Sequence, residues 1–128
     1  MGESKNIPRL SFRSRCPLST SLDILGDKWS LLVMRDIIML DKHTFKEFIS
    51  SPERIATNIL SNRLKRLEQM GLITRTQNQE NKRVFLYNAT ERGSALRDVL
   101  IAYVIWADKH LIDEHPSMLR LQDTKQAM

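Results

Sequence analysis

The chain has 128 residues, 41% of them hydrophobic, with 20 lysines and arginines against 15 aspartates and glutamates. This length fits one domain, and the aliphatic content excludes a disordered chain. The single cysteine, Cys16, excludes an intrachain disulfide, and no apolar run approaches the ~20 residues that a membrane span needs. Because the first residues also lack the apolar core of a secretory signal, we expect a cytoplasmic protein.

Positive charge is concentrated in the middle of the sequence. Between positions 54 and 83, seven basic residues stand against two acidic ones, whereas positions 107–115 carry three acidic residues and one lysine. This distribution, with a net charge of +5, is compatible with a polyanionic partner. An ordinary solvated surface has the same appearance, so charge alone does not identify the partner.

The first part of the chain is predicted to contain an arm and two helices. Residues 1–15 follow no hydrophobic period and are interpreted as a flexible basic arm. Pro17 opens a helix, because proline is favoured at a first helical position, and Gly26 is predicted to end that helix as a left-handed cap. Residues 28–40 are apolar on nearly every face, which is typical of a buried central helix.

The next segment has the pattern of a helix-turn-helix. A capping box at residues 44–47 predicts the start of a short helix, and the Ser-Ser-Pro sequence at 50–52 breaks it. A second helix is predicted over residues 56–70, with leucines on one stripe and Gly71 at its end.

The C-terminal half is predicted to contain a hairpin and one more helix. Residues 72–77 and 84–89 are predicted strands, joined by the basic connection 78–83. Thr90 is predicted to cap a single long helix that runs to about Asp113.

This order of elements predicts a mainly α fold with a small β-hairpin wing, the winged helix-turn-helix arrangement. The predicted organisation is a basic arm (1–15), a winged-helix domain that includes a C-terminal dimerisation helix (16–114), and a tail (115–128).

The predicted second helix of the helix-turn-helix has one polar side. The residues on this side are short donors and acceptors with one cation and no acid: Thr57, Asn58, Ser61, Asn62 and Lys65. We predict that they contact the major groove of DNA, where asparagine pairs with adenine and hydroxyl groups adapt to several base edges. A plain amphipathic surface helix is the alternative, but its exposed side would usually carry more glutamate and lysine. Lys82 and Arg83, at the tip of the wing, are predicted to contact phosphate or the minor groove.

The last predicted helix carries an apolar face that is longer than one small domain covers. Such a stripe usually marks a partner interface, so we expect a symmetric homodimer. The predicted dimerisation residues are Leu100, Tyr103, Val104, Ala107 and Leu111. The alternative is that this helix lies over its own core, which we expect for the end near Leu96.

Catalysis is not predicted. The three histidines belong to no metalloprotease pattern, and neither a serine-hydrolase nor a phosphate-loop motif occurs. His110 and His115 are five residues apart and off a shared helical face, so neither a zinc site nor any cofactor is expected. The remaining alternative to a DNA-binding protein is a winged-helix module that binds only proteins, and measurable duplex binding distinguishes the two.

Several spaced motifs resemble the HxlR-type winged-helix transcriptional regulators. They include Cys16-Pro17, the Gly-Asp-Lys-Trp sequence at 26–29, Arg35-Asp36, the recognition-helix sequence at 55–68 and the Thr-Glu-Arg-Gly sequence at 90–93. The resemblance covers about residues 16–113. It implies a bacterial, cytoplasmic regulator, repressor or activator, that binds pseudo-palindromic operators as a homodimer.

Two positions depart from the family pattern. The wing sequence at 81–87 looks more like that of MarR-type regulators. Ala56 stands where the family usually has serine or threonine, so either Thr57 caps the helix or the helix begins one residue later.

Cys16 has two interpretations. A helix N-terminus with Arg13 and Arg15 just upstream favours a thiolate, and some HxlR-type regulators are similar in using a cysteine here as a redox or electrophile switch. The alternative is a small residue tucked under the first helix. The sequence identifies no small-molecule effector, although it leaves room for one.

Overall fold

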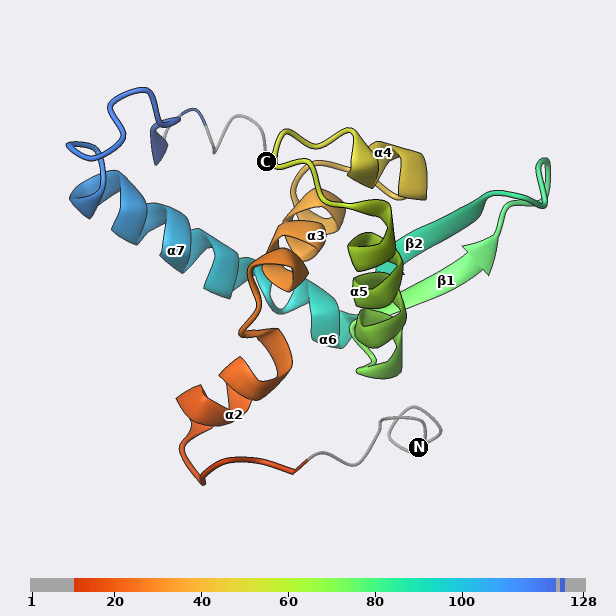
Figure 1. Cartoon of the computed structure of the whole chain (residues 1–128), viewed down its shortest axis with the longest axis horizontal. Coiled ribbons are helices and arrows are strands. Elements are labelled where there is room, and N and C mark those ends of the chain that lie inside the picture. Colours follow the sequence, from red (N-terminus) through yellow and green to blue (C-terminus); the bar gives the residue numbers. More distant parts are fainter. Residues whose placement is uncertain (1–10, 122, 124–128) are drawn as a thin grey trace.

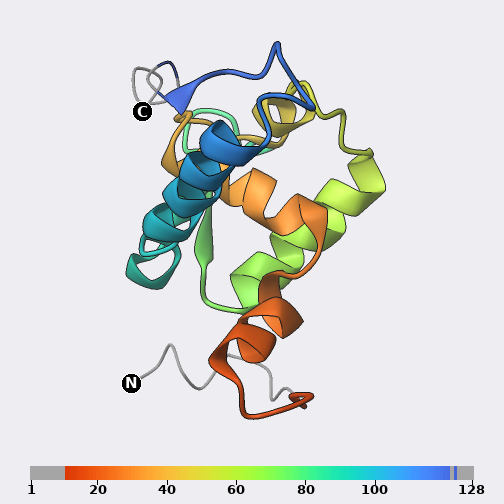
Figure 2. The same cartoon turned by 90° about the vertical axis from the view of Figure 1, so that its left-hand side faces the viewer.

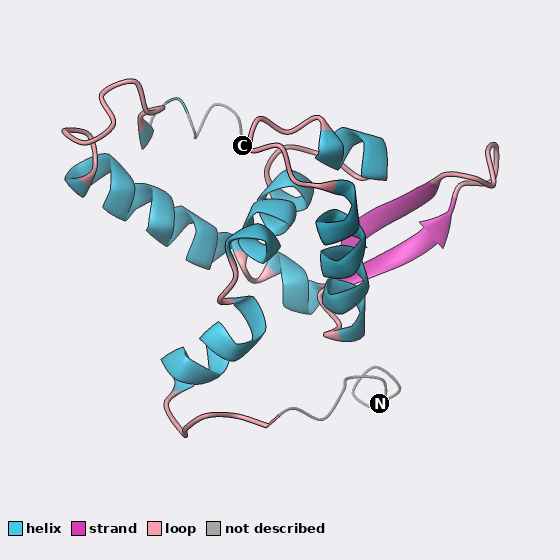
Figure 3. Ribbon diagram, in the orientation of Figure 1, coloured by secondary structure: helices cyan, strands magenta, loops and turns pink. Residues whose placement is uncertain are grey.

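The computed structural model describes residues 11–121 and 123. Its elements, in chain order, are α2 (Pro17–Leu25), α3 (Lys28–Ile38), α4 (Phe45–Ile49), α5 (Thr57–Gln69), β1 (Ile73–Gln77), β2 (Phe85–Ala89), α6 (Glu91–Ser94) and α7 (Arg97–His110). The hairpin of β1 and β2 extends away from the helices, on the side opposite α7 (Figure 1). These two strands are the only β structure in the described part of the chain (Figure 3). The predicted winged helix-turn-helix fold is confirmed. Most of the predicted arm (1–10) and part of the tail (122 and 124–128) lie outside the described residues.

Helix α3 forms the centre of the protein, with α5 and α7 packed on different sides of it (Figure 2). The buried side chains shared by α3, α4 and α5 are Val33, Met34, Ile37, Phe48, Leu60, Leu64 and Leu67. Phe48 meets Tyr87 of β2 edge-on, with ring centroids 6.0 Å apart. Burial of each large apolar side chain contributes about 1.5–3 kcal/mol, so the helix-turn-helix and the wing are stabilised by one common core.

Local cap chemistry ends and begins several helices where the sequence predicts. The Thr44 hydroxyl accepts from the Glu47 amide (3.2 Å), and the Glu47 carboxylate accepts from the Thr44 amide (3.1 Å), which confirms the capping box. Gly71 has a φ of 74°, and the Leu72 amide reaches back to the Leu67 carbonyl (3.0 Å). This left-handed cap turns the chain from α5 into β1.

The prediction for Gly26 is wrong in its conformation. Its φ of −74° is right-handed, because the chain continues directly into the cap residue of α3, Asp27. A Cβ at this position would collide with the Leu22 carbonyl oxygen, so glycine is needed for close approach and not for a positive φ.

The prediction of one long last helix is also wrong. A turn at Ala95 and Leu96 separates α6 from α7, and α7 ends at His110, short of Asp113. Gly93 in α6 lies directly against the Leu72 carbonyl, where no Cβ fits. We infer that this contact holds α6 at the base of the hairpin, while α7 turns away to pack on α3. None of the helices in the described part of the chain has the length and hydrophobicity to span a bilayer.

Candidate nucleic-acid interface

Helix α5 presents the predicted polar face to solvent. All the predicted contact residues of this helix are exposed, and they are Thr57, Asn58, Ser61, Asn62 and Lys65. The leucine stripe on the opposite side is buried in the core. Ala56 is the cap residue and offers no side-chain hydrogen bond, so Thr57 is the first helical residue and its hydroxyl does not cap the helix. Of the two sequence alternatives for this start, capping by Thr57 is therefore wrong.

Two other basic residues of α5 point inward to the junction between α2 and α3. The Arg63 Nε donates to Asp27 Oδ1 (2.9 Å), and the Arg66 Nη2 donates to the Asp23 carbonyl (2.9 Å). Burial alone would raise the pKa of Asp27, but hydrogen bonds from Ser30 and Arg63 outweigh it and lower the pKa to about 2. The basic residues in the middle of the sequence therefore have two roles. Arg63 and Arg66 tether α5 to the α2–α3 junction, and the others remain available at the surface.

Sequence reasoning missed this tether. Arg63 lies three residues after Leu60 and four before Leu67, which places it at the border of the buried stripe. That spacing was the available signal, because a long basic side chain at such a border reaches the neighbouring element.

A polar network holds the turn between α4 and α5. Arg35 donates to both carboxylate oxygens of Glu53 (2.8 and 2.9 Å) and also to Asp36. Buried Asp36 accepts from the Ser51 hydroxyl (2.6 Å), which in turn accepts from Lys42 Nζ (2.7 Å). Arg35 lowers the pKa of the Glu53 carboxyl group, so this pair is charged at neutral pH. The turn that orients α5 is thus fixed from α3.

The wing has an ordered basic tip. β1 and β2 pair antiparallel from Ile73–Ala89 to Gln77–Phe85. In the connection, Asn78 Oδ1 accepts from two backbone amides, and Asn81 Oδ1 accepts from the Arg83 amide (3.1 Å). Lys82 and Arg83 are exposed and form no ion pair with any residue in 11–121. These two cations are therefore available to an anionic ligand.

His43 joins the start of the helix-turn-helix to the wing. Its Nδ1 lies 2.9 Å from the Tyr87 carbonyl and its Nε2 2.7 Å from Asp41, while the Tyr87 amide donates to the His43 carbonyl (2.8 Å). Partial burial opposes the charged ring, but the hydrogen bonds with Asp41 and Tyr87 raise its pKa. The sequence assigned no role to this histidine.

Known proteins share this arrangement of a recognition helix and a basic wing on one core. The family model described as HxlR-like helix-turn-helix matches residues 24–115. The chain belongs to the HxlR family. The HTH-type transcriptional regulator YodB of Bacillus subtilis (strain 168) is 32% identical over 95 residues, which are 73% of this chain and 84% of YodB. YdeP of the same strain, an uncharacterised HTH-type transcriptional regulator, is 32% identical over 95 residues, 74% of this chain and 73% of YdeP.

Solved structures show the same fold. PA1607, a putative transcription factor, superimposes with a TM-score of 0.74 at 30% identity and covers 84% of this chain and 74% of its own. The reduced form of YodB gives 0.60 at 30% identity, covering 76% of this chain and 95% of YodB. This HxlR protein is accordingly a DNA-binding transcriptional regulator.

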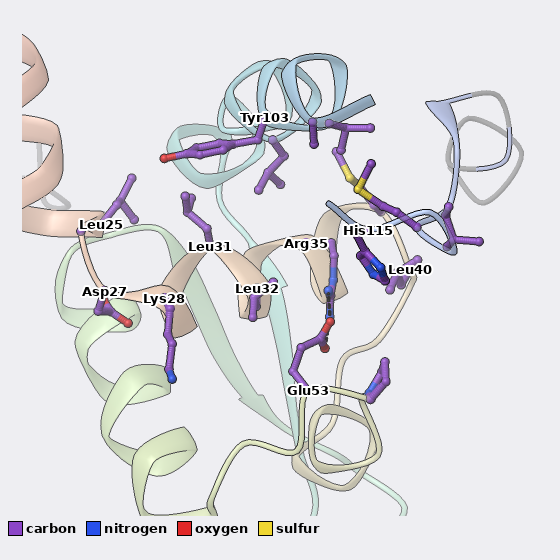
Figure 4. Close-up of a pocket in the computed structure, with 18 of the residues that line it drawn as sticks. Leu25, Asp27, Lys28, Leu31, Leu32, Arg35, Leu40, Glu53, Tyr103 and His115 are labelled. Carbon is purple, nitrogen blue, oxygen red and sulfur yellow. Dashed lines mark hydrogen bonds and ion pairs between the residues drawn. The ribbon is translucent and has the colours of Figure 1, made fainter. Parts of the chain in front are cut away.

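A groove in the HxlR protein is lined by residues of α2, α3 and α7. It has a volume of about 790 Å³ and a mainly apolar lining rich in leucine, with the Arg35–Glu53 pair at one side (Figure 4). Of the predicted dimerisation residues, the ones that line it are Leu100, Tyr103, Val104 and Ala107. Leu100 is buried in its own protomer, whereas the Tyr103 residue is 58% exposed. Leu111 is the C-cap residue that follows α7; it is half-buried and outside the groove lining.

Cys16 is exposed at the start of α2. The interpretation of a residue packed under the first helix is therefore wrong for the single protomer. Arg13 turns to Asp23, with its Nε 2.6 Å from Oδ1. Within residues 11–121 and 123, no group of three or more histidine, cysteine, aspartate or glutamate residues is placed to hold a metal ion.

Proposed function

We propose that this HxlR protein regulates transcription by binding pseudo-palindromic duplex DNA as a homodimer, with the polar face of α5 in the major groove. The residues assigned to the groove are Thr57, Asn58, Ser61, Asn62 and Lys65. Lys82 and Arg83 of the wing contact phosphate or the minor groove. The observation that carries this proposal is an exposed polar face, free of acidic residues from Thr57 to Lys65, on a helix whose opposite side is buried in the core. No catalytic activity is proposed, and the cytoplasm is the expected location.

The second copy of the chain is the proposed protein partner. Tyr103, Ile105 and Trp106 expose large apolar surfaces on α7, next to an apolar groove in the same protomer. Two-fold pairing through α7 and α2 would bury this surface and place two recognition helices about 34 Å, or a multiple of it, apart along DNA. In this arrangement residues 16–114 form the domain that binds DNA and dimerises, residues 1–15 form a basic arm, and residues 115–128 form a tail.

Selection of bound duplexes from a random pool tests the DNA interface. We expect the purified protein to enrich a pseudo-palindrome, and a variant with both Lys82→Ala and Arg83→Ala to bind that duplex more weakly. Glu80→Gln, in the same loop, is the control for a general disturbance of the wing. Enrichment of no duplex would leave the protein-only winged-helix module as the better account.

We also propose that oxidation of Cys16 modulates DNA binding. Two features support it: the thiol is exposed, and YodB has been solved in reduced, diamide-treated and quinone-bound forms. Two thiols from two copies would join as a disulfide while diamide accepts the two electrons and two protons. Operator affinity measured before and after diamide, with Cys16→Ser as control, tests this. Equal affinity of the wild type in both states would reject the switch and leave the DNA interface untouched.

A further inference from the structure

Arg63 connects the body of the protein with the recognition face. Its Nε is 2.9 Å from Asp27 Oδ1, and its Nη1 is 2.6 Å from the side-chain oxygen of Asn62. Asn62 is exposed on the polar face of α5, whereas Asp27 is the cap residue of α3. One guanidinium group therefore reaches from the cap of α3 to a side chain assigned to the major groove.

Asp27, the partner of Arg63 in the body of the protein, is held in place by hydrogen bonds from the first turn of α3. Asp27 accepts from the Trp29 amide (3.0 Å), the Ser30 amide (2.9 Å) and the Ser30 hydroxyl (2.6 Å). Hydrogen bonds from Ser30 and Arg63 outweigh the effect of burial and lower its pKa to about 2, so the carboxylate is charged throughout the neutral range. Because a guanidinium group is planar, fixing its Nε also fixes the direction of Nη1.

We propose that Arg63 determines which base edge Asn62 recognises, an inference that rests on the proposed DNA interface. An asparagine amide pairs with adenine in a bidentate way only when its oxygen accepts from the base and its NH₂ donates to it. Arg63 uses one of the two lone pairs of the Asn62 oxygen and turns this oxygen toward itself, so we expect the NH₂ group to be directed outward. Asn62 therefore selects an acceptor edge, guanine N7 and O6 or thymine O4, over the adenine edge.

Asn58 provides an internal comparison. It lies one helical turn before Asn62 on the same exposed face, and no residue within 11–121 forms a hydrogen bond with its side chain. Its amide oxygen and NH₂ group are both available, which permits the bidentate pairing with adenine. Two asparagines on one helix face thus have different expected base preferences, and the difference comes from Arg63.

The test is duplex selection with the full-length protein and three variants. Wild type is expected to prefer guanine or thymine where Asn62→Ala loses its preference, and adenine where Asn58→Ala loses its preference. Arg63→Lys keeps a positive charge near Asp27, but a single ammonium group does not hold both partners. We expect this variant to shift the Asn62 position toward adenine by at least fivefold in relative affinity, with the Asn58 position unchanged.

A fourth variant, Asn62→Asp, keeps the test decisive if Arg63→Lys unfolds. Asn62→Asp preserves an acceptor for Arg63 at an exposed position but removes the NH₂ donor, so it should abolish the guanine or thymine preference. Adenine at the Asn62 position in wild type, or an unchanged preference in either variant, would overturn the role of Arg63 and leave the DNA interface standing. A wild type that enriched no duplex would overturn the interface as well.

Discussion

Helices α5 and α7 each expose one long face, and the chemistry of the two faces is opposite. The leucine stripe of α5 is buried within the protomer, and the exposed side carries short polar groups, one lysine and, near the end of the helix, Glu68 and Gln69. On α7 just one residue, Leu100, is buried, while Tyr103 and Trp106 are 58% and 56% exposed. Exposed apolar surface costs about 25 cal/mol per Å² relative to burial. This difference supports the proposals that α5 faces a polar ligand and that a protein partner covers α7.

The largest expected effect comes from charging the α7 face. A variant with Tyr103→Asp and Val104→Asp should be monomeric, because a dimer would bury its carboxylates without a partner. Since two linked half-sites bind far more tightly than one, operator affinity should fall by roughly 100-fold or more. Sedimentation velocity at micromolar concentration measures the first effect, and a duplex titration measures the second.

The control for this variant uses exposed polar positions of the same helix. Asp98→Asn with Lys109→Gln should remain dimeric and bind DNA as the wild type does. If the wild-type protein itself sedimented as a monomer, the proposal that a second copy covers the apolar face of α7 would be wrong.

The next effect concerns the exposed cations of the wing. Replacing Lys82 and Arg83 with alanine should weaken binding to all sequences alike, and the salt dependence should flatten by about one unit of slope for each phosphate that the variant no longer neutralises. Affinity measured across a series of salt concentrations gives this slope, with Glu80→Gln as the matched loop control. An unchanged slope would show that the wing does not contact phosphate.

A smaller effect is expected at the recognition face. Asn58→Ala should relax the preference at one base pair per half-site by about 1–3 kcal/mol, because the variant cannot form the bidentate pairing. Competition between the selected duplex and its single-base variants measures this change in preference. Glu68→Gln, an exposed change farther along α5, should leave every preference in place.

The smallest expected effect is a pH-dependent loss of stability, which distinguishes the Arg63–Asp27 tether of α5 from the Arg97–Ile38 tether of α7. Asp27 has a folded-state pKa of about 2, below its ordinary value of 3.8. Its stabilising effect is therefore complete above pH ~4 and is lost as the pH falls toward ~2. Asp27→Asn, which retains a capping oxygen, should lower the free energy of unfolding by about 1–2 kcal/mol at pH 7, and the deficit should shrink in acid.

Helix α7 supplies the control for this pH dependence. Arg97 Nη2 donates to the Ile38 carbonyl (2.9 Å), so this tether contains no titrating carboxyl group. The deficit caused by Arg97→Met should stay constant between pH 5 and pH 2.5 in chemical denaturation. A constant deficit for Asp27→Asn as well would contradict the charged tether of α5.

Local signals predicted the parts of the fold that depend on neighbouring residues. The capping box at Thr44, the stop at Gly71 and the polar face of α5 all follow from groups within about one helical turn. The break at Ala95 was missed; it lies next to Gly93, which packs against the Leu72 carbonyl, a contact between residues distant in sequence. The helix pattern continues through that break, so no local signal marks it.

The sequence by itself determined the order of elements, the family, and which side of α5 is polar, because hydrophobic periodicity and cap chemistry act over a few residues. Only the tertiary structure decided how the central basic residues divide. Arg63 and Arg66 turn inward, since the α2–α3 junction presents Asp27 and the Asp23 carbonyl to them. Lys82 and Arg83 lie in the loop at the end of the hairpin, where they remain exposed and form no ion pair with any acidic side chain of residues 11–121. Charges of the same sign acquire different roles because pairing depends on distances that folding alone creates.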